Sequence, residues 1–204
     1  MQTDTKKDTR NHIITVGTEM IALVGYNATG LDAILKKAGV PKGSFYYYFP
    51  SKEAFGLAVI ERFAERYDSY LSSFLEDTTQ TPLMRIQRYC EHVILKLTET
   101  NFSRGCLIGT LGQELAGHHA LFREKLDAIF HAWCQRFATC FREATSQQNL
   151  TDAPDPDTLA SFFLASWEGA ILRAKVMKSP EPLHDFKTMM FSRIIGADQS
   201  SPQR

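Results

Sequence analysis

The chain has 204 residues, of which 44% are hydrophobic and 23% charged, and its formal net charge is zero. A globule of this size buries roughly 70% of the surface of its unfolded chain, so its folding needs neither a metal nor a disulfide. No apolar run approaches the roughly 20 residues that span a bilayer, and residues 1–10 are too polar for a secretion signal. We therefore expect a cytoplasmic protein with no membrane partner.

The charge is unevenly distributed along the chain. Residues 1–52 contain seven Lys/Arg and four Asp/Glu, so this segment carries +3 and the remainder carries −3. A small basic excess permits local contact with nucleic acid but does not establish it.

The cysteines and histidines show no pattern of a metal or catalytic site. Cys90, Cys106, Cys134 and Cys140 form no CxxC pair and lack the His spacing of a zinc site. In a cytosolic chain they are best interpreted as free thiols. A cysteine nucleophile would need a positioned base and an oxyanion site, and no recognised catalytic motif supplies them. We expect no metal, no cofactor and no catalytic residue, and a Cys-dependent enzyme remains a remote alternative.

The first quarter of the chain predicts three short helices and the start of a longer one. Apolar residues share one helical stripe between Ile13 and Val24, with Asp8 or Thr9 as N-cap and Gly25 as the stop. A second helix covers about 31–38, and a third covers about 41–47 with Pro41 in its first turn. Ser51 caps the fourth helix, which connects the two parts of the chain over residues 53–76.

The remaining periodic segments are also helical, and no convincing alternating strand is found. The predicted helices cover about 82–97, 106–115, 120–144, 156–177 and 183–195. Thr81-Pro82 restarts the first of them, and Asp155 is the N-cap before 156–177. The sequence therefore predicts an all-α fold of about nine helices. The last eight residues, 197–204, are expected to form a flexible tail.

The second and third predicted helices form a helix-turn-helix pattern. Gly39 supplies the positive φ that the tight turn needs, and Val40 anchors the third helix in the core. Such a third helix enters the major groove of DNA with its N-terminus first. The alternative is an aromatic core helix, and for Phe45 and Phe49, four residues apart, a core position is the better interpretation.

The leading and outward residues of the third helix suit DNA contact. Lys42 offers a charge to phosphate, Gly43 lets the backbone come close, and Ser44 carries a compact hydroxyl. Tyr46, Tyr47 and Tyr48 can reach phosphates or thymine methyls. Lys52, in the first turn of the next helix, would hold the adjoining backbone.

At this point the sequence resembles a known family. The 25 residues TGLDAILKKAGVPKGSFYYYFPSKE, from Thr29 to Glu53, are similar to the signature of TetR-family regulators. The resemblance implies a helix-turn-helix DNA-binding domain over residues 1–52. It also implies a ligand-binding and dimerisation domain over residues 53–196, which binds an inducer and dimerises through its last two helices. One residue departs from the family pattern, because Gly30 replaces the usual Ser/Thr before the second helix. The phosphate contact of that hydroxyl must therefore fall to Thr29 or be absent.

The C-terminal half is similar to two kinds of repressor within that family. The segments RGCL (104–107), GQE (112–114) and WEGAILRAK (167–175) resemble regulators of acrylate utilisation and of the reductase that detoxifies N-ethylmaleimide. The resemblance implies an inducer that is acrylate-like or another small electrophile.

Cys106 is the candidate for a reactive thiol. It is predicted in the first turn of a helix, two residues after Arg104, and both features favour a thiolate, the form that attacks electrophiles. Lys175 would add charge if the two helices touch. The alternative is that Cys106 is a small inert core residue, the usual state of a free cysteine.

Three further residues are candidates for the inducer pocket, each with a plainer alternative. Trp167 could instead be core, Glu168 could pair with Arg173 or Lys175, and Gln113 has no partner that the sequence identifies. Small residues between Ala160 and Ala170 accompany Phe162, Phe163 and Trp167 on a helix that is apolar over a wide arc. A homodimer interface shared with the final helix explains this arc, and a monomer core is the alternative.

Overall fold

A computed structural model describes residues 2–148 and 154–196, and within those ranges every regular element is helical. The all-α prediction is confirmed, with nine α-helices and a π-helical turn in the described residues. The predicted flexible tail, 197–204, lies outside them. The bounds are α1 (Gln2–Val24), α2 (Leu31–Ala38), α3 (Lys42–Tyr48), α4 (Lys52–Leu75), α5 (Pro82–Glu99), α6 (Leu107–Leu115), α7 (Ala120–Gln148), α8 (Pro156–Met177), α9 (Glu181–Met189) and the π-turn Met190–Ile194.

Most helix ends follow the predicted capping residues. The Ser51 hydroxyl accepts from the Ala54 amide, Thr81 caps α5, and the Asp155 carboxylate caps α8 through the Thr158 amide. The predicted start of the first helix at Asp8 or Thr9 is wrong, because α1 begins at Gln2. Gln2, Lys6 and Lys7 are good helix formers and no Gly or Pro lies among residues 2–7, so this polar segment extends the helix instead of interrupting it. Pro41 was predicted in the first turn of the third helix. In the structure it is the N-cap of α3, one residue before that turn.

Packing divides the chain into two compact units that are not continuous in sequence. The first contains residues 1–67 and 106–129, and the second contains 68–105 and the described residues from 130 onward. The long helices α4 and α7 each contribute their ends to different units. The predicted boundary after residue 52 divides the chain by function and not by packing, and it stays a prediction.

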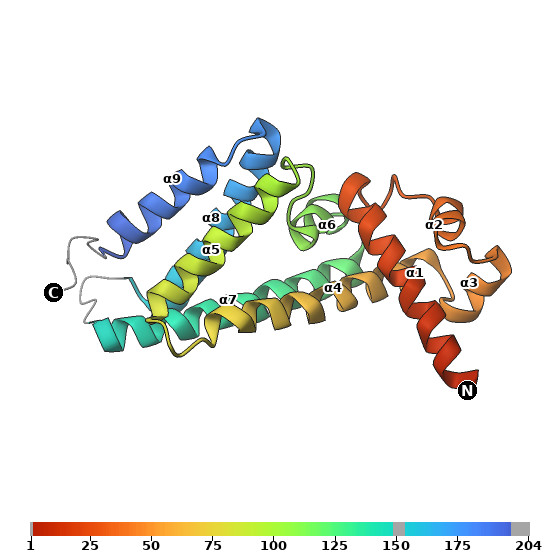
Figure 1. Cartoon of the computed structure of the whole chain (residues 1–204), viewed down its shortest axis with the longest axis horizontal. Helices are drawn as coiled ribbons and strands as arrows, with labels where there is room; N and C mark the ends of the chain where they lie inside the picture. Colours follow the sequence, from red (N-terminus) through yellow and green to blue (C-terminus); the bar gives the residue numbers. More distant parts are fainter. Residues whose placement is uncertain (1, 149–153, 197–204) are drawn as a thin grey trace. The chain divides into compact units, whose positions relative to one another are not determined.

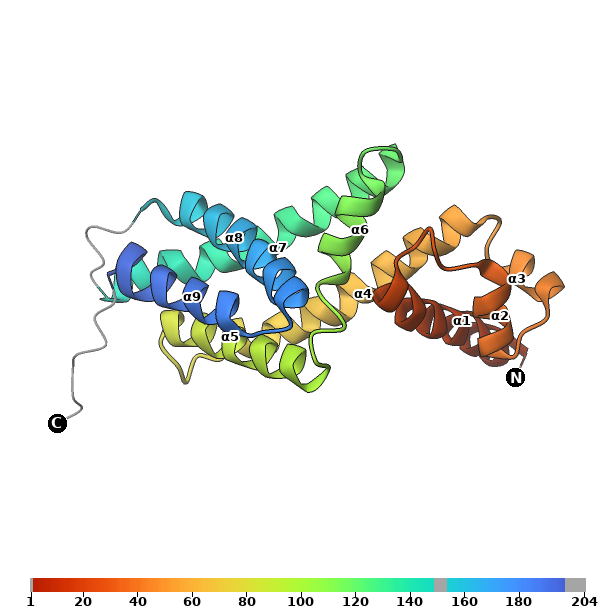
Figure 2. The same ribbon diagram turned by 90° about the horizontal axis from the view of Figure 1, so that it is seen from above.

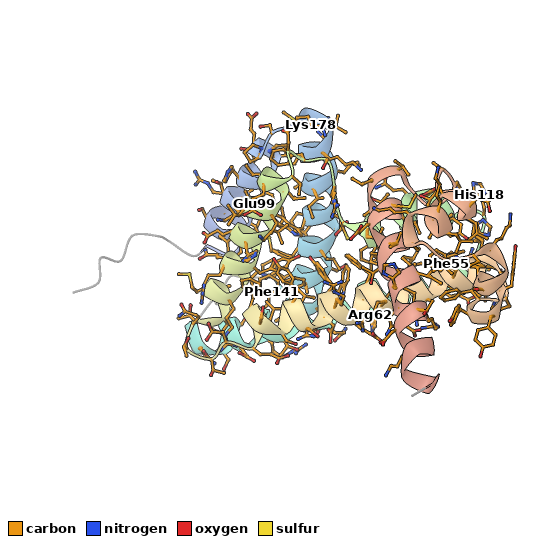
Figure 3. All side chains as sticks on the ribbon, turned by 45° about the vertical axis from the view of Figure 1, so that its right-hand side comes forward. Phe55, Arg62, Glu99, His118, Phe141 and Lys178 are labelled. Atoms are coloured by element: carbon orange, nitrogen blue, oxygen red, sulfur yellow. The ribbon has the colours of Figure 1, made fainter. Side chains whose placement is uncertain are left out.

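The first unit has an aromatic core between α1, α3 and α4. Figure 1 labels these three helices. The ring centroid of Phe55 lies 5.7 Å from that of Phe45 and 5.1 Å from that of Phe49. Phe55 is labelled in Figure 3, inside this unit. Gly17 of α1 borders the Phe55 ring so closely that a Cβ at this position would overlap it. Glycine is therefore required at residue 17 for this helix contact.

The second unit is built from the end of α4, α5, the end of α7, α8 and α9, and Figure 2 shows α9 beside α8. Tyr89, Phe137 and Phe163 form its aromatic centre, with ring centroids 5.4 Å apart for Tyr89–Phe137 and 4.6 Å for Phe137–Phe163. Buried Arg85 donates to Glu143 at 2.8 Å and to the backbone carbonyls of Leu75 and Gln80. These bonds satisfy a guanidinium that would otherwise be costly to bury. Among the described helices, none has the length and apolarity needed to cross a membrane.

Candidate functional site

The turn between α2 and α3 has the geometry that the sequence predicts. Gly39 has φ of 66°, and the Val40 amide donates to the Leu35 carbonyl at 3.0 Å. This left-handed turn ends α2 and redirects the chain into α3. Phe45 and Phe49 are 0% and 2% exposed, which confirms their predicted place in the core.

The opposite face of α3 is open to solvent. Tyr46 and Tyr47 are 56% and 63% exposed, an unusual position for two large aromatic side chains on one short helix. Lys42 and Gly43 are exposed on the same helix, and a Cβ at Gly43 would meet nothing within 4 Å. Residues 42, 43, 46 and 47 lie on adjoining positions of successive turns, so together they form one exposed face. Ser44 and Tyr48 are half-buried at its margins.

Lys42 already has a partner within the first unit. Its Nζ lies 2.8 Å from Oδ1 of Asp32 on α2, and this carboxylate raises the pKa of the Lys42 amine. Both side chains are exposed, so the ion pair is weak and can be exchanged for another anion.

Thr29 and Lys52 are not part of this exposed face. Thr29 is 1% exposed, and its hydroxyl donates to the Gly25 carbonyl at 2.5 Å. The Lys52 amine donates to the Tyr26 carbonyl at 3.0 Å and lies 4.6 Å from the centroid of the Tyr26 ring. Desolvation lowers the pKa of Lys52. In this structure both residues stabilise the loop between α1 and α2.

Glu114 of α6, which was not predicted as a functional residue, stabilises the same loop. Its carboxylate accepts from the Tyr26 amide at 2.8 Å and from the Asn27 amide at 2.6 Å. A Cβ at Gly25, where φ is 86°, would lie 2.8 Å from Oε2 of Glu114. The partners of these two bonds are separated by 88 and 87 positions in the sequence, so no local pattern could have identified the bonds. The neighbouring Gln113, which was predicted as a residue of the inducer pocket, is exposed.

Cys106 is the N-cap of α6. Its sulfur accepts from the Gly109 amide at 3.5 Å, and the side chain is half-buried. Burial raises the pKa of the other three thiols, Cys90, Cys134 and Cys140, the last to about 11. A thiol with a raised pKa is a poor nucleophile at neutral pH.

The predicted ligand and sensor residues do not form one cluster within a single unit. Cys106 and Gln113 belong to the first unit, whereas Arg104, Trp167, Glu168 and Lys175 belong to the second. In the second unit Arg104 is exposed, Glu168 and Lys175 are half-buried, and Trp167 is fully buried. A Cβ at Gly105 would lie 3.8 Å from Cδ of Lys175 and 3.5 Å from Ile171, so this glycine lies directly against α8.

The second unit also has an exposed apolar stripe on α8. Phe162, Leu172 and Val176 are 49%, 42% and 67% exposed, and Ala165 and Gly169 lie between them on the same face. The predicted small-residue stripe is therefore divided, because Ala160 and Ala170 are buried in the core of the unit. Figure 3 labels Lys178, which ends α8 and donates to the Phe102 carbonyl at 3.0 Å.

Comparison with known protein families finds matches to both parts of the chain. Residues 13–59 match the family described as bacterial regulatory proteins, tetR family. Residues 82–190 match the family described as tetracyclin repressor-like, C-terminal domain. The first match includes the exposed face of α3, and the second includes the aromatic centre of the second unit.

Individual relatives cover nearly the whole chain. The transcriptional regulator AcuR of Cereibacter sphaeroides is 43% identical over 185 residues, which are 89% of this chain and 82% of AcuR. The HTH-type transcriptional repressor NemR of Escherichia coli K12 is 32% identical over 185 residues, 91% of this chain and 93% of NemR. A crystal structure of a regulatory protein TetR from Rhodobacter sphaeroides superposes with a TM-score of 0.83 at 41% identity, covering 88% of this chain and 95% of that one.

Proposed function

Because the chain belongs to the TetR family of bacterial transcriptional regulators, we propose that it represses transcription as a homodimer that a small molecule releases from operator DNA. The exposed face of α3 is the observation that carries this proposal. Two tyrosines that are more than half exposed, beside a lysine with an exchangeable partner, suit a helix that lies in a major groove. A protein with this role works where the bacterial chromosome lies, in the cytoplasm.

The DNA contacts that we propose follow from the exposed residues. Lys42 exchanges Asp32 for a phosphate, and Gly43 allows the helix to approach the backbone. Tyr46 and Tyr47 contact base edges or phosphates, with Ser44 and Tyr48 at the margins. Thr29 and Lys52 act indirectly, since both hold the loop before α2.

The homodimer that we propose forms through the apolar stripe on α8, together with α9. Two α3 helices of such a dimer would read successive major grooves about 34 Å apart in a near-palindromic operator. TetR regulators act as dimers, and an exposed stripe of this length is hard to explain in a monomer.

The inducer that we propose is acrylate-like or another small electrophile. Cys106 supports it, because a sulfur at a helix N-terminus is stabilised as the thiolate, and the other thiols are disfavoured by burial. Repression relieved by modification of Cys106 is the alternative to reversible binding. Neither mechanism requires a reaction with turnover, so we propose a regulator and not an enzyme.

The experiment that tests this proposal is fluorescence anisotropy on the DNA upstream of the chain's own gene, against a scrambled duplex. Lys42→Ala should weaken binding. It should also reduce the slope of log K against the logarithm of the salt concentration by about one, the effect of one lost phosphate contact. Tyr47→Ala should weaken binding at every salt concentration. Lys96→Ala, which removes an equally exposed lysine from α5 in the second unit, is the matched control and should have no effect. If Lys42→Ala and Tyr47→Ala bound the DNA as tightly as the Lys96→Ala control, that result would contradict the proposed DNA surface.

Acrylate added to the wild-type complex tests the inducer. Release of DNA that persists in Cys106→Ser would indicate reversible binding, and release lost in that variant would indicate modification of the thiol. An unchanged complex in the presence of acrylate would contradict the acrylate-like inducer and leave the DNA surface unaffected.

A further inference from the structure

The indole nitrogen of Trp167, Nε1, has no hydrogen-bond partner. Among the described residues it is the one buried side-chain nitrogen or oxygen atom of which this is true. The residue is 0% exposed, so solvent does not reach its indole N–H from outside. Buried donors in native proteins nearly always have an acceptor, and an unpaired one calls for an explanation. An apolar side chain would fill the same space without leaving a donor unpaired, so the indole nitrogen indicates a function beyond packing.

The surroundings of Trp167 are aromatic and come from three helices of the second unit. Its ring centroid lies 6.3 Å from Tyr89 on α5, 6.4 Å from Phe163 on α8 and 5.1 Å from Phe186 on α9. The Phe163 ring is close to parallel with the indole, at 18°. These three side chains carry no charge near neutral pH. A ligand site with apolar walls and one directed polar group is the common form of a small-molecule site.

We propose that the Trp167 indole N–H is the hydrogen-bond donor of the inducer site, and that its ligand is a small neutral molecule with a carbonyl oxygen. This inference rests on the proposed function and, of its two inducer classes, favours a neutral carbonyl compound over acrylate, which is an anion near neutral pH. An acceptor is required because an indole nitrogen can only donate. A neutral ligand is favoured because a carboxylate among these aromatic rings would lose its hydration.

This site would bind its ligand reversibly and without a covalent step. It lies in the second unit, whereas Cys106 lies in the first, so recognition by Trp167 and modification of Cys106 can be tested separately. An unsaturated ketone or amide could use both residues, whereas its saturated analogue could use only Trp167. Saturated probes therefore isolate the proposed site from thiol chemistry.

The test is NMR spectroscopy of the full-length chain with ¹⁵N-labelled indoles. The sequence contains two tryptophans, so Trp167→Phe and Trp133→Phe assign both N–H signals. Butanone and propionamide, which are neutral carbonyl compounds, should move the Trp167 signal downfield and leave that of Trp133 in place. Propionate, their anionic counterpart, should require a much higher concentration. No movement with any probe would overturn the site, and a response to propionate at the lowest concentration would overturn the neutral class.

Trp167→Phe keeps an aromatic ring at the position and removes the N–H. We expect it to weaken butanone binding about tenfold, the effect of one lost hydrogen bond. Trp133→Phe is the matched control, because Trp133 is also a buried tryptophan of this unit, and it should keep wild-type affinity. Equal affinity of both variants would overturn the inference. Operator binding without ligand reports on the proposed function separately, since both variants should bind DNA as the wild type does if they are folded.

Discussion

Lys42 is the exposed side chain that, under the proposed function, would have one partner in the free state and another in the DNA-bound state. In the structure its amine pairs with Asp32 at 2.8 Å, and both side chains are more than 60% exposed. A phosphate that approaches α3 competes with this carboxylate for the same amine, and it also meets the negative charge of Asp32. Under the proposed function, the ion pair would order Lys42 before DNA binds, and the negative charge of Asp32 would oppose binding.

Asp32→Asn should strengthen operator binding roughly two- to fivefold, the range expected from one exposed ion pair. The substitution frees Lys42 and removes a negative charge from the DNA-facing part of the unit. Anisotropy titrations at two salt concentrations measure the effect, which should be larger at the lower one because salt screens exposed charges. Glu99→Gln removes a similar exposed partner of Lys96 and should leave affinity unchanged. Weaker binding by Asp32→Asn would show that the ion pair positions Lys42 for the phosphate.

At the scale of elements, α6 has a direct bond to the loop that precedes α2. Glu114 accepts from two backbone amides of that loop, and its charge also acts on the Tyr26 phenol. The pKa of Tyr26 is raised to about 12, chiefly by burial and then by the charges of Glu53 and Glu114. A movement of α6 would therefore change both the backbone bonds and the environment of Tyr26.

Glu114→Gln should lower the pKa of Tyr26, weaken the α1–α2 loop and reduce operator affinity. The folded state holds the Tyr26 proton more tightly than the unfolded chain does. The contribution of Tyr26 to stability is therefore fully present below about pH 10 and is lost as the pH rises toward 12. The variant should lose less stability than the wild type across that interval. NMR titration of labelled tyrosines and urea unfolding at several pH values measure the two effects. Glu124→Gln, an exposed carboxylate on α7, is the control, and an unchanged Tyr26 pKa in Glu114→Gln would contradict the argument.

The elements also show which features a sequence can predict. Gly39, Ser51 and Asp155 act on neighbouring residues, so this turn and these two caps were predicted correctly. Contacts between distant residues were not predicted. Gln113 was predicted as a pocket residue and Glu114 was not, because the partners of Glu114, Tyr26 and Asn27, are distant in the sequence. The burial of Thr29 was missed for a related reason, since a hydroxyl in a polar loop gives no sign that it will donate to the Gly25 carbonyl.

At the scale of the whole molecule, the exposed stripe on α8 is the surface that a second copy would cover. The opposite face of α8 packs in the core of the second unit, where Phe163, Trp167 and Ala174 are fully buried. Along the exposed face, Phe162, Gly169 and Val176 recur every seven residues. A helix that is apolar on both faces is favoured where it is covered on both sides.

Gly169→Arg should convert the dimer to a monomer without unfolding the chain. A Cβ at this position would meet nothing within 4 Å, so the longer side chain fits the single copy and obstructs only a neighbour. Light scattering coupled to size exclusion measures the mass, and anisotropy should show operator affinity reduced by about 100-fold or more, because two linked half-sites bind cooperatively. Gly169→Ala is the control. It adds only a methyl group and improves helix propensity, so it should remain dimeric and bind DNA. A dimeric Gly169→Arg with normal affinity would show that the copies associate through another surface, whereas a monomer that still bound the full operator tightly would contradict the requirement for a dimer itself.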